Sequence, residues 1–127
     1  MAGDPTAERM RRAFQRNADS SQAIADQNRK DIDYLKERNK QLMDEIKSDE
    51  EEEKRRKAQF DSDQKRLKEQ AEKAGNKFSP SQYIPLKDQE ILIDKARLKT
   101  NQDQIRYKEE EIRRWEESAK FWRSHAQ

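Results

Sequence analysis

The sequence has 127 residues, of which 44% are charged and 30% hydrophobic. A globular domain usually contains about 45–50% apolar residues, so this chain is too polar to bury one sizeable core. Its 29 basic and 27 acidic residues give a net charge of +2, which is too small to indicate nucleic-acid binding. The lack of cysteine excludes disulfides, a thiolate nucleophile and a cysteine-based zinc site.

The composition favours helices over strands. The sequence contains no valine and only two glycines, and its opposite charges alternate over distances that form i,i+4 pairs on a helix. We therefore predict an all-α protein, an extended coiled coil of two long helices joined by a proline-containing elbow. A chain that stays disordered until it meets a partner is the alternative that such high charge leaves open.

A short tail, residues 1–4, precedes the first predicted helix, residues 5–75. Asp4 is suited to cap free N–H groups, and Pro5 suits the first helical position, where its missing donor does not matter. No further glycine or proline occurs before Gly75, which suits a helix C-terminus. A helix so long and polar has no core of its own, so we expect it to pair with another helix.

The apolar residues of this helix follow a heptad pattern, which is typical of a coiled coil. Ile32 and Ile46 occupy a positions of the repeat, and Leu35 and Leu42 occupy d positions. The predicted seam residues are Phe14, Ile32, Leu35, Asn39, Leu42 and Ile46. Polar residues occupy most seam positions between 47 and 75, which predicts a weakly paired or solvent-bathed stretch.

Asn39 occupies an a position in the middle of this seam. One asparagine at such a position costs stability but fixes the register and favours two strands. Ile32 at a with Leu35 at d favours the same assembly, so we interpret Asn39 as a device for parallel two-stranded pairing. An asparagine tolerated near a solvated end is the alternative.

The flanking charges bear on whether the two strands are identical. In a parallel homodimer Glu45 would face Glu50 across the seam. Glu111 would likewise face Glu116, although other flanking pairs would be favourable. These mixed signs favour a heterodimer with another coiled-coil chain. A homodimer is the alternative.

The stretch 76–86 is the one clear break. Pro80 and Pro85 favour extended backbone in the residues before them. Because the break also carries apolar residues that prefer to be packed, we expect an ordered elbow. These residues are Phe78, Tyr83, Ile84 and Leu86.

A second coiled-coil helix is predicted over residues 87–127. Four isoleucine or leucine residues fall seven apart, and two tryptophans continue the seam at d positions. The predicted seam residues here are Ile91, Leu98, Ile105, Ile112, Trp115 and Trp122.

No pattern in the sequence indicates chemistry, and we predict no catalytic, cofactor-binding or metal-binding residues. The only histidine, His125, has no neighbours with the spacing of metal ligands or of a general base's partners, and is interpreted as a surface side chain. No apolar run resembles a signal peptide or a membrane span of about 18 residues. We expect a soluble cytoplasmic protein without membrane insertion.

Three basic clusters are candidate contacts to a large acidic surface such as a microtubule lattice. The alternative is that each cluster is satisfied within its own helix. The residues concerned are Arg9, Arg11, Arg12, Lys54, Arg55, Arg56, Lys57, Arg113 and Arg114.

Residues 11–46 combine an arginine–aromatic start, a Ser-Gln pair, and spaced Ile, Leu, Asn and Leu leading into an acidic patch. The positions that carry this pattern are Arg12, Phe14, Ser21, Gln22, Ile32, Leu35, Asn39 and Leu42. The run resembles the N-terminal segment of the coiled-coil subunits of the ciliary outer-dynein-arm docking complex. The "NKFSP" at 76–80 and the restart near "LKDQEILIDKARL" resemble the interruption and second helix of that family.

The resemblance implies a non-enzymatic structural role on the cytoskeleton of a cilium. A coiled-coil heterodimer would lie on the doublet microtubule, contact the tubulin lattice and dynein-arm subunits, and anchor outer dynein arms. The alternative function is an intracellular helix-bundle tether or adaptor that folds back at the 76–86 break or folds on binding a partner.

Overall fold

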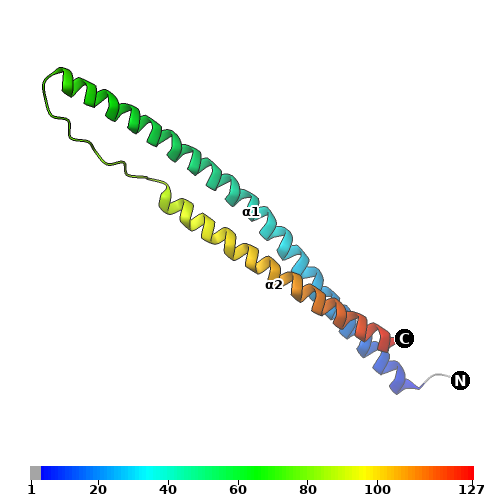
Figure 1. The fold of residues 1–127 in the computed structure, drawn as a ribbon. Coiled ribbons are helices and arrows are strands. Elements are labelled where there is room, and N and C mark those ends of the chain that lie inside the picture. Colours follow the sequence, from blue (N-terminus) through cyan, green and yellow to red (C-terminus); the bar gives the residue numbers. More distant parts are fainter. Residues whose placement is uncertain (1–3) are drawn as a thin grey trace. The chain divides into compact units, whose positions relative to one another are not determined.

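The structure, a computed structural model, describes residues 4–127. It contains two helices, α1 (Pro5–Lys73) and α2 (Asp88–Ala126), and the described residues form no strand (Figure 1). The chain is therefore all-α, as its composition predicts. Of the predicted N-terminal tail only Asp4 is described, and the rest of that prediction lies outside the described residues.

Contacts divide the chain into two units, and both helices contribute to each of them. Unit 1 comprises the chain up to Asn39 together with Lys99–Gln127, and unit 2 comprises Lys40–Leu98. Each unit thus contains a stretch of α1 packed against a stretch of α2.

The two ends of α1 have the local contacts that the sequence indicates. The Thr6 amide donates a 2.9 Å hydrogen bond to Asp4 Oδ1, so Asp4 caps the first turn. At the other end Gly75 has a φ of 72°, a left-handed conformation that glycine adopts without a steric cost. The Asn76 amide donates to the Ala71 carbonyl at 2.8 Å, which completes a Schellman motif. The helix ends at Lys73, two residues before the predicted boundary.

In unit 1 the two helices run antiparallel (Figure 1). Ser21 Oγ lies 3.0 Å from Ser118 Oγ, and Lys108 Nζ lies 3.1 Å from Asp31 Oδ2. Because the residue number rises along α1 as it falls along α2, the directions are opposite. The register is set by direct side-chain contacts on both sides of the seam.

Small residues let the helices of unit 1 approach closely. Ala18, Ala25 and Ala119 are fully buried, and Ser21 is 4% exposed. A larger side chain at these positions would separate the backbones and break the contact between the Ser21 and Ser118 hydroxyls. Close approach also buries most of the apolar surface available to two such polar helices.

Unit 2 is a helix–connector–helix arrangement with the same narrow apolar seam, and its connector is residues 74–87. Leu42 is 1% exposed, and Ile46 and Ile91 are also buried. Beside this seam Lys95 Nζ forms a 3.1 Å ion pair with Glu50 Oε1. The core of the unit is thus one row of side chains flanked by charges.

The twelve residues predicted to form the seam are all buried or half-buried. Those on α1 lie toward α2 in each unit, so the helix across the seam belongs to the same chain. The buried predicted seam residues are Ile32, Leu35, Asn39, Leu42, Ile46 and Ile91. The half-buried ones are Phe14, Leu98, Ile105, Ile112, Trp115 and Trp122. Leu67, at a seam position within the polar stretch, is 45% exposed.

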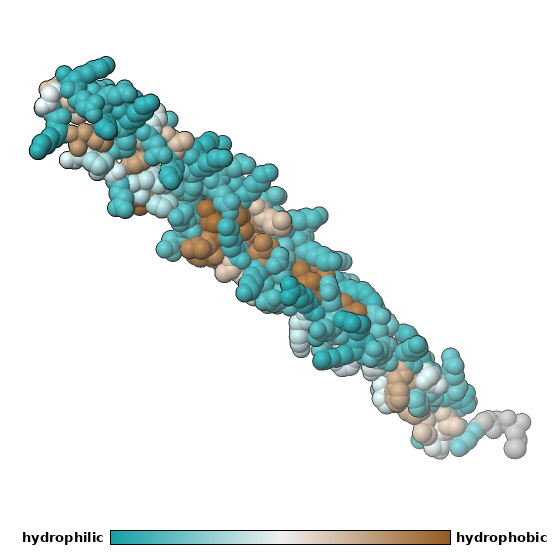
Figure 2. All heavy atoms as spheres, in the orientation of Figure 1, coloured by the Kyte–Doolittle hydropathy of each residue, from teal (hydrophilic) through white to brown (hydrophobic). Residues whose placement is uncertain are grey.

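Outside the seam the surface is mainly polar. Figure 2 shows hydrophilic residues over most of one face of the molecule, with hydrophobic residues in small groups between them. Neither α1 nor α2 is both long and apolar enough to cross a membrane, among the residues the structure describes.

Truncation of the seam at Leu42 is the direct test of this packing. Leu42→Ala should lower the free energy of unfolding by about 2–3 kcal/mol, since a buried leucine loses both its transfer free energy and its packing. The matched control is Leu67→Ala, which should cost less than about 1 kcal/mol because Leu67 is 45% exposed. Chemical denaturation followed by circular dichroism measures both, and equal losses would contradict the assigned seam.

Candidate functional site

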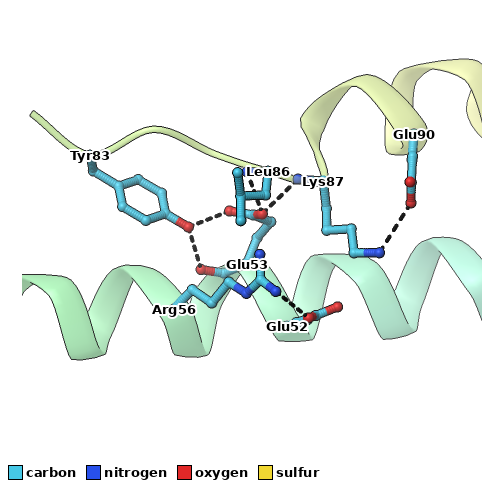
Figure 3. Close-up of polar contacts among 7 residues, drawn as sticks. All are labelled: Glu52, Glu53, Arg56, Tyr83, Leu86, Lys87 and Glu90. Atoms are coloured by element: carbon cyan, nitrogen blue, oxygen red, sulfur yellow. Dashed lines mark hydrogen bonds and ion pairs between the residues drawn. The ribbon is translucent and has the colours of Figure 1, made fainter.

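Glu53 holds the connector of unit 2 against α1 (Figure 3). Its Oε1 atom accepts hydrogen bonds from the Leu86 and Lys87 amides at 2.8 and 2.7 Å. Its Oε2 atom accepts a hydrogen bond from the Tyr83 hydroxyl. Glu53 is only 9% exposed, so one buried carboxylate satisfies three donors from a segment about 30 residues away in the sequence.

This carboxylate lies at the start of α2. The Lys87 carbonyl accepts the first helical hydrogen bond, from the Ile91 amide at 2.9 Å, which makes Lys87 the N-cap residue. A lysine side chain provides no acceptor for the free N–H groups at a helix start. Glu53, from α1, accepts from the Lys87 amide and from that of Leu86 before it. Its negative charge is favourable beside the positive end of the α2 dipole.

The contact between Glu53 and Tyr83 shifts the pKa of both groups. The hydrogen bond from Tyr83, followed by those from the Lys87 and Leu86 amides, lowers the pKa of Glu53 although its partial burial opposes this shift. The same hydrogen bond raises the pKa of Tyr83 to about 12, because the neutral hydroxyl donates to the carboxylate. The pair is therefore stable with Glu53 ionised and Tyr83 neutral.

Two further contacts hold the connector along α1. The Ser81 amide donates to Gln64 Oε1 at 3.0 Å, and the Tyr83 ring lies 5.4 Å from that of Phe60. The sequence led us to expect packing for all the apolar residues of the break, but Ile84 and Leu86 are 73% and 65% exposed. The connector is held by polar and aromatic contacts instead.

The role of Glu53 was missed at the level of sequence, where it fell in a stretch predicted to be weakly paired. The available signal was indirect. Glu53 occupies an a position of the heptad, and the helix that starts at Asp88 follows a lysine that cannot cap it. An acid at a seam position, together with a helix start that has no capping side chain, is the sequence pattern that indicates such a contact.

Aromatic side chains gather in unit 1, where the end of α2 meets the start of α1. Phe14 stacks on Trp122 with 5.5 Å between ring centroids, and Phe121 lies 4.3 Å from the His125 ring. His125 Nδ1 is 2.8 Å from the Phe121 carbonyl, within hydrogen-bonding distance. Phe121 remains 53% exposed and is the part of this cluster that offers apolar surface to a partner.

The predicted basic clusters differ in what they contact. Arg56 is half-buried and forms a 2.9 Å ion pair with Glu52, and Arg114 forms a 3.1 Å ion pair with Glu111. Arg12 is 3.9 Å from Glu8. The remaining members are exposed and form no ion pair among the described residues: Arg9, Arg11, Lys54, Arg55, Lys57 and Arg113.

The charges that flank the seam are matched between α1 and α2. In unit 1 Arg29 forms an ion pair with Glu116, beside the Lys108–Asp31 pair. Hydrogen bonds from Gln27 and then Lys108 lower the pKa of Asp31. Exposed pairs of this kind contribute about 0–1 kcal/mol each. Their main effect is to favour this pairing over others in which like charges meet.

Asn39 is the exception in the seam of unit 1. It is 9% exposed, and its Oδ1 atom has no hydrogen-bond partner. The parallel assembly predicted from Asn39 is not the arrangement found in unit 1, where the seam faces an antiparallel helix. An unsatisfied buried acceptor costs about 1–3 kcal/mol, so Asn39 weakens the pair locally.

Within residues 4–127 no group of three or more His, Cys, Asp or Glu side chains is arranged to hold a metal ion. Searches against protein-family models, curated proteins and solved structures find no match for this chain.

The Glu53 contact predicts a specific acid sensitivity. Because the folded state lowers the pKa of Glu53, its contribution to stability is present above the unfolded value of about 4.3 and is lost as the pH falls below it. Glu53→Gln should lower the melting temperature at neutral pH and reduce the further loss between about pH 5 and pH 3.

Glu51→Gln is the matched control, since Glu51 is exposed on the same turn of α1 and should retain the pH dependence of the wild type. Thermal melts followed by circular dichroism across this pH range compare the three proteins. Identical pH profiles for the wild type and Glu53→Gln would contradict the assigned role of Glu53.

Proposed function

We propose that this chain is a non-enzymatic structural protein that docks other components through its charged helical surface. The observation that carries the proposal is the separation of apolar residues in the seam from charged residues on the outward surface. Apolar side chains such as Leu42 and Ile91 are used in pairing α1 with α2, and the outward positions carry most of the charge. Such a surface suits recognition by extended, charged partners.

The groups with acid–base chemistry support a structural role. The Glu53 carboxylate is occupied by three donors, and His125 contacts a helix carbonyl through Nδ1. Each of these side chains contributes to the position of a helix or connector. Their contacts hold the fold in place and leave the exposed arginines and lysines for binding.

The most specific version of the proposal is a ciliary docking protein that anchors outer dynein arms to doublet microtubules. Its support is the resemblance of residues 11–46 to the docking-complex subunits. Because Ile32 and Leu35 in that run pack toward α2, a second coiled-coil chain in a heterodimer would contact the outward positions of the helices. The exposed Arg9 and Arg11 would contact acidic tubulin segments.

A second candidate is an intracellular tether or adaptor. The helix–connector–helix arrangement of unit 2 favours it, since Glu53 fixes the start of α2 beside α1. In that role the chain would join partners without binding a filament.

Co-sedimentation with polymerised tubulin separates the two candidates. The docking proposal predicts that the purified chain pellets with microtubules at low ionic strength and is released by salt. Arg9→Glu/Arg11→Glu should weaken this binding by roughly tenfold or more, because both arginines are exposed and form no ion pair with any residue of 4–127.

The control variant is Lys36→Glu/Lys40→Glu, which changes the net charge equally at exposed sites outside the basic clusters. Microtubules stripped of their acidic tails provide a second control. A wild-type chain that stays in the supernatant at low salt would refute filament docking and favour the tether.

A further inference from the structure

The end of the connector and the first turns of α2 carry large aliphatic side chains that no part of unit 2 covers. Ile84, Leu86 and Leu92 are 73%, 65% and 66% exposed, and Ile93 is 48% exposed. Figure 2 shows hydrophobic residues gathered over the first turns of α2. Four large aliphatic side chains exposed within ten residues of a chain that is only 30% hydrophobic form an unusual concentration. These four residues are called the apolar face below.

A groove of about 510 Å³ between α1 and α2 lies at the edge of the apolar face, where Ile93 contributes to its wall. Four carboxylates and one guanidinium line the groove. They belong to Glu45, Asp49, Glu90, Asp94 and Arg97. Arg97 is already paired with Asp94 at 3.6 Å. Glu90 first, and then Asp49 and Glu52, raise the pKa of the nearby Lys87.

The apolar face therefore fits a segment that is apolar at its centre and cationic around it. Burial of Leu92 and Ile93 would supply affinity, and the carboxylates would select positive side chains and set the salt dependence. An acidic or uncharged helix would leave those carboxylates opposite like charges or without partners.

The start of α1 in this same chain is such a segment. Met10 is 52% exposed and lies among Arg9, Arg11, Arg12 and Arg16, all of which are exposed on the first turns of the helix. Of these arginines only Arg12 has an ion pair among the described residues, and its distance to Glu8 is 3.9 Å. The exposed ring of Phe121 adds apolar surface at the same end of unit 1. This group, Met10 with its four arginines, is called the basic end below.

We infer that the apolar face of one copy of this chain docks the basic end of a second copy, with the arginines beside the carboxylates of the groove. The contact joins different surfaces on the two copies, so a bound pair still offers one free apolar face and one free basic end to further copies. The result is head-to-tail, salt-sensitive self-association. It does not depend on microtubule binding, because the purified chain alone suffices.

Sedimentation velocity over a range of protein and salt concentrations tests the inference. The wild type should associate reversibly at low ionic strength and revert to monomers when salt screens the charges. Arg9→Glu/Arg16→Glu should raise the apparent dissociation constant by roughly tenfold or more, and Glu45→Lys/Asp49→Lys should raise it by a similar factor.

A mixture of the two charge-reversed variants gives the sharpest result. Each variant alone places like charges at the contact. In the mixture, the acidic end of Arg9→Glu/Arg16→Glu faces the basic groove of Glu45→Lys/Asp49→Lys. The mixture should therefore associate as the wild type does. Restoration by mixing identifies the two surfaces as partners, which neither single variant does.

Two more variants keep the test specific. Leu92→Ser/Ile93→Ser should abolish association with unchanged charge, and Lys36→Glu/Lys40→Glu should leave it intact although the net charge falls by the same amount as in the arginine variant. Circular dichroism verifies that each variant remains helical. A monomeric wild type at low salt, loss of association in the lysine control, or a mixture that stays monomeric would each overturn the inference.

Discussion

Burial of one narrow apolar row is the constraint on which the rest of the structure depends. A polar helix of 69 residues exposes its apolar side chains unless a second helix covers them, and α2 provides that cover. Because so few apolar residues are available, the helices must approach closely, which explains the alanines at 18, 25 and 119. Packing of this kind leaves little tolerance for a gap at Leu42.

Two polar features decide how that row is used. The flanking charges favour the antiparallel direction, because Glu50 pairs with Lys95 and Glu116 pairs with Arg29. A parallel homodimer would instead place Glu50 opposite Glu45 and Glu116 opposite Glu111. Glu53 then holds the start of α2 beside α1, since its carboxylate accepts from the Leu86 and Lys87 amides. Stability, direction and register thus have different physical sources in the same pair of helices.

Much of the helical content and the position of the break followed from the sequence. Heptad periodicity identified residues such as Leu42 and Ile91 as facing another helix, and Gly75 gave the end of α1. The direction and identity of the facing helix did not follow, because an a/d pattern is the same in either orientation. The Glu53–Tyr83 contact joins residues 30 positions apart and has no local periodic signal, so it required the structure.

Pairing of α1 with α2 of the same chain is most directly tested by a disulfide across unit 1. The sequence has no cysteine, and the Ser21 and Ser118 hydroxyls are 3.0 Å apart. Oxidised Ser21→Cys/Ser118→Cys should form a bond within one chain and run as a compact monomer on a non-reducing gel. Ser20→Cys/Ser118→Cys, with Ser20 exposed, should not. Oxidation of the first variant to dimers linked through residue 21 of both chains would contradict the account.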